Sequence, residues 1–343
     1  FTADYWGKLG GESFIYYRPV TIFSHFIDYT LYGLNPGGHH FSNLVFHTLV
    51  TLLVFQLFLY LCKPRLLIPL IGASLFALHP IHTHSVSYIM GRTDILSVLF
   101  FLGGLILLLH ATLHETKRYR ILQIMGGCFC YLLALLCKEI AVTLPLIFIL
   151  YWFCWSSDHP SWKDPRFTAP CLSLCGTLAL YLMLRGLAVG LIPSEDAIPS
   201  SWYSLWQRAS LVFITCGFYL QKLFFPFRLC YFSNLSVPVN WLAVIQSSFF
   251  WTGILWIIAF VFSLKRSRPF SFALGWIGIT LLPVLNIILI PTLARENFLY
   301  LPSVGFCLLL PLLMHSLANE VQYTRRWILG ATVTASILLG VLY

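Results

Sequence analysis

Apolar runs of about twenty residues recur along almost the whole chain and are separated by short polar gaps. Each run is close to the length that a helix needs to cross the hydrocarbon of a bilayer. Eleven such runs can be marked: 43–62, 66–83, 94–113, 121–137, 140–155, 168–189, 206–225, 242–263, 271–292, 298–318 and 327–343. The pattern predicts an all-α multi-pass membrane protein.

The basic residues between the runs are concentrated in alternate gaps. Twelve of the 21 Lys and Arg lie in five gaps with only four acids, whereas the rest of the chain holds nine basic and eight acidic residues. The twelve are Lys63, Arg65, Lys117, Arg118, Arg120, Lys163, Arg166, Lys265, Arg266, Arg268, Arg325 and Arg326. Because cytoplasmic loops carry the excess of Lys and Arg, we assign these gaps to the cytoplasm. Topology then accounts for the formal net charge of +9, and no nucleic-acid partner is needed.

One run breaks the parity of this topology. The gaps 156–167 and 265–268 are both cytoplasmic, so an even number of crossings must separate them, yet three runs lie between them. Run 206–225 carries Arg208, Gln221 and Lys222, and we expect it to lie along the outer interface. About ten crossings remain.

The composition leaves no room for a large soluble domain. The chain is 59% apolar and 10% charged, whereas soluble domains are about 25% charged. We expect residues 1–42 to form an outer first loop, with an interfacial helix in the apolar repeat 20–32, and residues 43–343 to form the transmembrane core. No helical repeats of about 34 residues follow the last run. Since Phe1 is not Met, we expect the chain to be part of a longer protein.

Polar residues gather in the gaps assigned to the outer face. The segment His79-Pro80-Ile81-His82-Thr83-His84 holds three histidines, but Pro80 disturbs the turn and no carboxylate or Cys lies at ligand spacing, so no metal is expected. Farther along, Arg92 and Asp94 either pair and cap a helix or bind an anionic headgroup.

Two adjacent pairs of opposite charge each open an apolar run. They are Lys138-Glu139 and Arg295-Glu296. Each pair either neutralises itself or serves a site, with the cation on a phosphate and the acid on sugar hydroxyls. The repetition favours a shared site. On the run that begins near residue 43, the polar face of His40, Asn43 and His47 predicts hydrogen bonds between helices rather than ligand contacts.

In their order, these motifs resemble the transmembrane core of the transmembrane-and-tetratricopeptide-repeat O-mannosyltransferases and their bacterial relatives. The resemblance covers nearly the whole chain and runs through Asp4–Gly7, Tyr17–Pro19, Gly33–Pro36, His79–Thr83, Gly91–Asp94, Lys138–Glu139 and Arg295–Phe306.

The resemblance implies a C-type glycosyltransferase helical core, with interfacial helices on the outer face. The implied reaction is inverting transfer of a mannose-like hexose from a polyprenyl- or dolichyl-phosphate donor to a hydroxyl of protein Ser or Thr, or of a glycan, on the periplasmic or lumenal face. The lipid-phosphate sugar is the donor substrate, and no cofactor is implied. The absent repeats favour the bacterial inner membrane over the endoplasmic reticulum membrane. The alternative function is a sugar-lipid carrier or flippase without transfer.

The resemblance also assigns roles to residues. Cations for the lipid phosphate are Arg18, Arg92, Lys138 and Arg295, which we expect to share one cavity. Sugar- or acceptor-binding residues are His79, His82, Asp94, Glu139, Glu296 and Tyr300. The family's acidic pair is expected upstream of Phe1, which leaves Asp4 as a secondary candidate for the catalytic base. His84 stands where the family commonly has Glu.

Overall fold

The computed structural model describes residues 17–113, 116–155, 163–189, 204–227, 229, 235, 237–238, 240–287 and 293–320. Within these ranges the chain folds into α-helices and short 3-10 helices, and no β-strand occurs there. The all-α prediction is confirmed for this part of the chain. Asp4 and the apolar run 327–343 lie outside the described residues.

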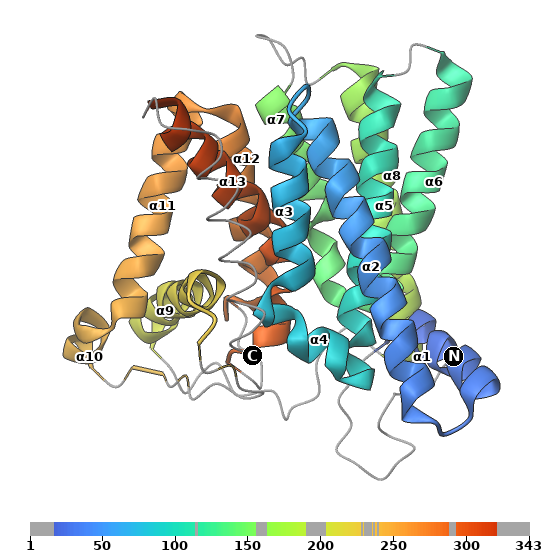
Figure 1. Cartoon of the computed structure of the whole chain (residues 1–343), viewed down its shortest axis with the longest axis horizontal. Coiled ribbons are helices and arrows are strands. Elements are labelled where there is room, and N and C mark those ends of the chain that lie inside the picture. Colours follow the sequence, from blue (N-terminus) through green and yellow to red (C-terminus); the bar gives the residue numbers. More distant parts are fainter. Residues whose placement is uncertain are drawn as a thin grey trace.

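Most long helices run side by side in one bundle (Figure 1). The first half contains α1 (Pro19–Tyr32), α2 (Pro36–Leu61), α3 (Leu67–Leu78), η2 (Pro80–His82), α4 (Thr83–Ser87), η3 (Ile89–Gly91), α5 (Arg92–Leu113), α6 (Lys117–Cys137), η4 (Glu139–Thr143) and α7 (Leu144–Trp155). The second half contains α8 (Pro165–Val189), α9 (Leu205–Phe224), α10 (Trp241–Gln246), α11 (Ser248–Arg266), α12 (Arg268–Leu281), η6 (Leu282–Val284), η7 (Glu296–Leu299) and α13 (Pro302–Glu320).

Five helical segments among the described residues are long and apolar enough to cross a membrane: Pro36–Leu61, Ile89–Leu113, Lys117–Cys137, Pro165–Ala188 and Ser248–Lys265. Four shorter apolar helices accompany them, Leu67–Leu78, Glu139–Trp155, Arg268–Val284 and Pro302–Leu317. All nine coincide with predicted runs, and the chain is a membrane protein. The number of crossings stays a prediction.

Helix α9 differs from its neighbours in direction. It is 20 residues long but is not among the five long apolar segments. Figure 1 shows it across the direction of α11, which it contacts extensively. This orientation agrees with the expectation that run 206–225 lies along an interface.

The bundle is interrupted between α3 and α5. Pro80 forces the preceding residue out of the helical region, and His79 is accordingly extended, with φ −67° and ψ 123°. The predicted run 66–83 is therefore too long, because α3 ends at Leu78. The chain then makes the short turns η2, α4 and η3 at one end of the bundle before α5 begins. This irregular stretch carries the histidine motif.

Helix α1 lies at the same end of the molecule as α4 (Figure 1). Phe23, Phe26 and Leu31 are exposed on it, whereas Thr21 and Asp28 are buried against the protein. A helix with its apolar side outward suits the predicted interfacial position. On α2, Asn43 and His47 are buried as predicted, but His40 is exposed in the helix's second turn, and its assignment to the buried stripe is wrong.

Candidate active site

Lys138 and Glu139 point to different partners because the backbone turns between them. Helix α6 ends at Cys137, Lys138 is extended with φ −158° and ψ 141°, and η4 begins at Glu139. The Lys138 ammonium forms an ion pair with Asp94, which lies in the first turn of α5. A carboxylate there is also favoured by the helix dipole. Both side chains are buried.

Asp94 also receives a hydrogen bond from a third motif. The Asn297 side-chain amide donates to the second carboxylate oxygen of Asp94 at 3.1 Å. The Phe298 ring lies 5.0 Å from the Lys138 ammonium. Asp94 therefore joins the segments around residues 92, 138 and 297, and a shared substrate site there stays a prediction.

Arg18 and Glu139 form a more accessible pair beside the first one. The Arg18 guanidinium donates to the Glu139 carboxylate at 2.8 Å, and the two side chains are 19% and 29% exposed. Of the acids in the five described ion pairs, Glu139 has the most exposed side chain. This pair is less buried than the Lys138–Asp94 pair beside it.

Glu296 is held from α9. The Lys222 ammonium lies 3.0 Å from its carboxylate. One turn earlier, the Tyr219 hydroxyl accepts a hydrogen bond from the backbone N–H of Arg295 at 3.3 Å. The sequence identified Lys222 as a cation in an apolar run but did not predict its partner. A charged residue in such a run is energetically costly and often marks a functional site.

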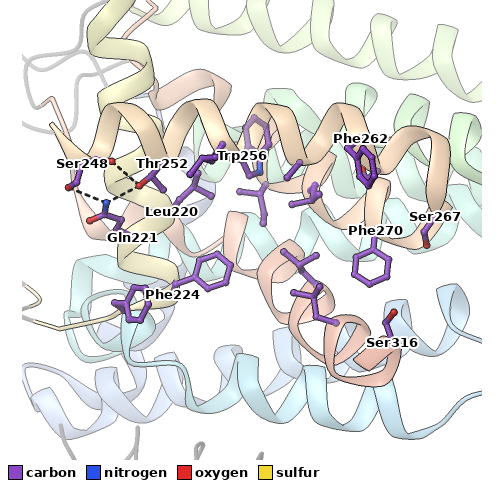
Figure 2. A pocket seen from close by; sticks show the side chains of 18 residues that line it. Leu220, Gln221, Phe224, Ser248, Thr252, Trp256, Phe262, Ser267, Phe270 and Ser316 are labelled. Atoms are coloured by element: carbon purple, nitrogen blue, oxygen red, sulfur yellow. Dashed lines mark hydrogen bonds between the residues drawn. The ribbon is translucent and has the colours of Figure 1, made fainter. Parts of the chain in front are cut away.

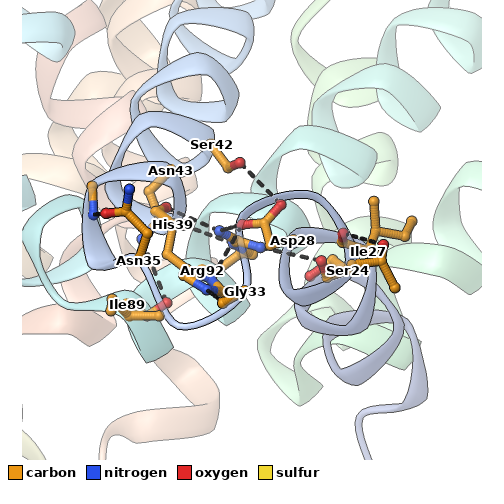
Figure 3. A network of polar contacts seen from close by, with 12 residues as sticks. Ser24, Ile27, Asp28, Gly33, Asn35, His39, Ser42, Asn43, Ile89 and Arg92 are labelled. Carbon is orange, nitrogen blue, oxygen red and sulfur yellow. Dashed lines mark hydrogen bonds and ion pairs between the residues drawn. The ribbon is translucent and has the colours of Figure 1, made fainter.

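Arg92 is fully buried and surrounded by protein acceptors (Figure 3). Its Nε donates to the Asn43 side-chain oxygen at 2.7 Å, and a terminal nitrogen pairs with Asp28. The guanidinium also donates to the backbone carbonyl oxygens of His39 and Ser24, at 3.0 and 3.3 Å. Of the alternatives for Arg92 and Asp94, their pairing with each other does not occur here, since α1 supplies Asp28 to Arg92 instead. In this arrangement Arg92 offers no exposed surface to a lipid phosphate.

The remaining predicted residues, His79, His82 and Tyr300, form a buried aromatic layer with His47. The ring of His82 lies 4.7 Å from that of Tyr300 and 5.9 Å from that of His79. The Tyr300 hydroxyl bonds to Nδ1 of His47 at 2.7 Å, and Nε2 of His82 bonds to the Ser303 hydroxyl at 2.8 Å. These residues are at most 6% exposed, so none meets a substrate directly in this conformation.

Hydrogen bonds fix the tautomer of His79. Its Nε2–H donates to the Leu223 carbonyl at 3.1 Å, while Nδ1 accepts from the backbone N–H of Ile81 at 3.2 Å. Burial lowers the pKa of His79 from 6.5 to about 4, and the pKa of His82 falls well below 6.5, also through burial. Both imidazoles are therefore neutral near pH 7. Among the described residues, no group of three or more His, Cys, Asp or Glu is placed to hold a metal ion.

The structure thus brings the predicted residues together only in part. Arg18, Asp94, Lys138 and Glu139 form two adjoining pairs, with Asn297 linking the segment of Arg295 and Glu296 to them. Arg92 belongs to a separate cluster with Asp28. A large cavity does exist in the described structure, but none of the four predicted cations lines it. Arg92, which has no exposed surface, contributes to no cavity in this arrangement, whereas a shared cavity for Arg18, Lys138 and Arg295 stays a prediction.

Comparison with known proteins gives relatives that are named as enzymes. The chain is 27% identical to Protein O-mannosyl-transferase F38B6.6 of Caenorhabditis elegans over 93% of this chain and 45% of the relative. It is 26% identical to human Protein O-mannosyl-transferase TMTC3 over 90% of this chain and 37% of the relative. It is 27% identical to Protein O-mannosyl-transferase TMTC4 of Mus musculus over 99% and 52%.

The chain spans about half, or less, of the length of these relatives. No protein-family model matches it, and no solved structure matches it. The chain is related over most of its length to the TMTC-type protein O-mannosyl-transferases, the family that its motifs resemble.

Proposed function

We propose that this chain forms the transmembrane catalytic part of an inverting mannosyltransferase. The donor is a polyprenyl- or dolichyl-phosphate hexose, and the acceptor is a hydroxyl of protein Ser or Thr. The single observation that carries the proposal is the meeting of three distant motifs at Asp94, which pairs with Lys138 and accepts a hydrogen bond from Asn297. The printed names of the relatives support the same reaction class.

The proposed chemistry needs cations at the departing lipid phosphate and a carboxylate near the acceptor hydroxyl. The acceptor oxygen attacks the anomeric carbon, the lipid phosphate leaves, and a carboxylate takes the hydroxyl proton. We assign Arg18 and Arg295 to the phosphate, with the buried Lys138 ammonium as a further positive charge behind them, because positive side chains stabilise the charge that develops on the phosphate. Arg92 is left out of this set, since its donors are already bound to protein oxygens.

Glu139 is the described carboxylate that we place nearest to the substrate hydroxyls. It is paired with Arg18 yet keeps exposed surface. The proton acceptor itself is proposed to come from the first outer loop, with Asp4 as the candidate within this chain. Asp94 and Glu296 then hold the cations and loops around the site, because both carboxylates are buried and paired.

We further propose that the active face is lumenal and that the membrane is that of the endoplasmic reticulum. The relatives reported above come from animals, which have no bacterial inner membrane. The positive residues of the alternate gaps put α1, α4 and α9 on the non-cytoplasmic side, and these elements share one end of the molecule in Figure 1.

The test is donor turnover by the full-length protein in proteoliposomes. Dolichyl phosphate carrying radiolabelled mannose is the donor, and labelled mannose transferred to peptide or released from the lipid is measured. Glu139→Gln should reduce turnover at least about tenfold, since a hydrogen bond from a substrate hydroxyl to a charged carboxylate contributes about 1.5–3 kcal/mol. Lys117→Gln, an exposed change in a gap assigned to the cytoplasm, should leave it unchanged.

The outcomes separate the transferase from the carrier. If wild-type protein binds the donor but never breaks the mannose–phosphate bond, with peptide or water as acceptor, the carrier function replaces the transferase. If the wild-type protein and the Glu139→Gln variant turn the donor over equally well, Glu139 is not part of the active site.

A further inference from the structure

A large apolar cavity lies away from the ion-paired network, between α9, α11, α12 and α13 (Figure 2). Its volume is about 1180 Å³, above the range of about 300–1,000 Å³ that is usual for pockets that hold drug-sized ligands. No part of the proposed reaction uses this space. A cavity of this size and lining can hold a large apolar molecule.

The lining changes character along the length of the cavity. Figure 2 shows Trp256, Phe262 and Phe270 in its middle and far parts, with the serines Ser267 and Ser316 at the far end. At the near end, the Gln221 amide donates to the Thr252 hydroxyl at 2.9 Å and to the Ser248 hydroxyl at 3.4 Å. The cavity is therefore an elongated apolar slot with polar groups at its two ends.

The slot faces the surroundings of the bundle rather than its interior. Leu255 and Phe262, which line it from α11, are each 64% exposed, and Leu313 on α13 is 37% exposed. Helix α11 is one of the five long apolar helices, and at its depth the surroundings are hydrocarbon. A lipid chain can enter sideways from the bilayer without crossing water.

Helix α9 connects the slot to the ion-paired network. Thr215, Tyr219 and Lys222 lie on one face of α9, at spacings of four and three residues. They contact, in turn, Asn286 at 3.1 Å, the backbone of Arg295 at 3.3 Å and Glu296 at 3.0 Å. The residues on the other face, Leu220, Gln221 and Phe224, line the slot. Gln221 at the polar near end of the slot therefore precedes Lys222 of the ion pair in the sequence, and the two side chains lie on different faces of the same helix.

We propose that this slot holds the isoprenoid chain of the lipid-phosphate donor, with the phosphate directed past Gln221 toward the ion-paired network. The proposal rests on the proposed function. An isoprenoid phosphate has one long apolar chain and an anionic head, which matches an apolar slot whose polar end lies on the helix that also carries Lys222. A phospholipid has two chains to place, and a zwitterionic head gains less from cations. The aromatic side walls provide a large apolar contact area for the chain.

The first experiment locates the chain without needing catalysis. Full-length protein in proteoliposomes is photolabelled with a polyprenyl phosphate that carries a diazirine near the end of its chain, and the labelled peptides are identified by mass spectrometry. Labels are expected in α11, α12 and α13. Excess dolichyl phosphate should compete, and an equal excess of phosphatidylcholine should not.

Labels confined to other helices, or equal competition by phosphatidylcholine, would overturn the slot assignment. Absence of any label would do the same, and would indicate that the chain's own run 327–343 or bulk lipid fills the space. Labelling of the slot in a protein that shows no mannose turnover would keep the slot and reject the transferase. The two proposals therefore fail separately.

The second experiment fills the slot. Ala259→Trp places an indole in the cavity, whereas Ile258→Trp puts the same side chain on the neighbouring, exposed position of α11, which does not line it. Ala259→Trp should raise KM for a long-chain donor about tenfold, the loss expected for roughly two buried methylene groups. It should leave KM for a donor with a two-isoprene chain unchanged. The slot assignment would be contradicted if Ala259→Trp and Ile258→Trp raised KM equally. It would also be contradicted if Ala259→Trp raised KM equally for the long-chain and the two-isoprene donor.

Discussion

The guanidinium of Arg18 lies 2.8 Å from the carboxylate of Glu139, and this contact joins positions that are 121 residues apart in the chain. Lys138, the residue before Glu139, pairs in the opposite sense with the buried Asp94. Two consecutive residues therefore carry two ion pairs of different accessibility. The Arg18–Glu139 pair is the more exposed of the two, and the Lys138–Asp94 pair holds the start of α5 against the end of α6.

The more exposed Arg18–Glu139 pair can be tested by removing one of its charges at a time. Arg18→Ala and Glu139→Ala should each lower donor turnover at least about tenfold. Their effect on thermal stability should be small, because a partly exposed ion pair contributes only about 0–1 kcal/mol. Turnover per mole of monodisperse protein and the unfolding temperature are measured together.

The control for this prediction is the double exchange Arg18→Glu with Glu139→Arg. If the pair serves only to hold two segments together, the exchange restores turnover. We expect it to restore stability but not turnover, because the cation and the acid would then occupy the wrong ends of the substrate. Full recovery of turnover would assign the pair a purely structural role.

Arg92 should behave in the opposite way. Replacing it by Leu leaves the Asp28 carboxylate buried without its cation, and breaking a buried pair costs about 3–5 kcal/mol. We expect Arg92→Leu to lower the yield of monodisperse protein sharply, and the double variant with Asp28→Leu to recover much of it. Size-exclusion chromatography and thermal unfolding give the answer.

A different result would return Arg92 to the phosphate-binding set. In that case Arg92→Leu would keep wild-type stability, and only its affinity for dolichyl phosphate would fall.

The helical architecture follows from apolar runs, but their ends do not. The runs coincide with nine apolar helices because hydrocarbon requires long apolar segments with internally bonded backbones. The predicted run 66–83 includes the first residues of the stretch from His79 to Gly91. The length of an apolar run does not reveal that Pro80 forces His79 into an extended conformation and so ends the helix. A local steric effect thus decided where the irregular polar segment begins.

The candidate site was predictable by residue type but not by partner. The charged motifs identified Lys138, Glu139 and Asp94, which the structure brings together. They did not identify Asp28 or Lys222, because each belongs to a largely apolar helix and gains its partner only when helices cross. A charge in a largely apolar helix is the signal that could have found both, since such a charge needs a buried counter-ion.

At Arg295, the structural role of the backbone can be tested separately from the proposed catalytic role of the side chain. Its backbone N–H, rather than its side chain, makes the hydrogen bond to Tyr219 of α9. Arg295→Ala should therefore keep this contact and the monodispersity of the purified protein while abolishing donor turnover. The matched control, Arg65→Ala, removes an exposed arginine from a gap assigned to the cytoplasm and should change neither. Unchanged turnover in Arg295→Ala would remove that side chain from the site.

Acid should destabilise the fold through its buried histidines. His79 has its pKa lowered to about 4 by burial, so between pH 6.5 and 4 the unfolded chain binds a proton that the folded chain does not. Stability is therefore complete above pH 6.5 and declines as the pH falls toward 4. At pH 5 the loss from His79 alone is about 2 kcal/mol. His82 acts in the same direction.

Thermal unfolding in detergent at pH 7.5 and pH 5 measures this effect. His79→Gln keeps a donor for the Leu223 carbonyl and removes the titrating group, so the variant should lose less stability on acidification than the wild type does. Equal losses in both proteins would show that His79 does not carry the pH dependence.

Tyr300 tests whether a buried residue contacts the substrate. The resemblance implies that it binds the sugar or the acceptor, whereas the structure buries it. Its hydroxyl bonds to Nδ1 of His47 at 2.7 Å, and the residue is 1% exposed. Tyr300→Phe leaves that ring nitrogen buried without its partner, which costs about 1–3 kcal/mol. We expect a lower unfolding temperature with unchanged KM for donor and acceptor. If the hydroxyl instead meets the sugar once substrate binds, KM will rise while the unfolding temperature of the free protein stays the same, since only the substrate complex would then lose a hydrogen bond.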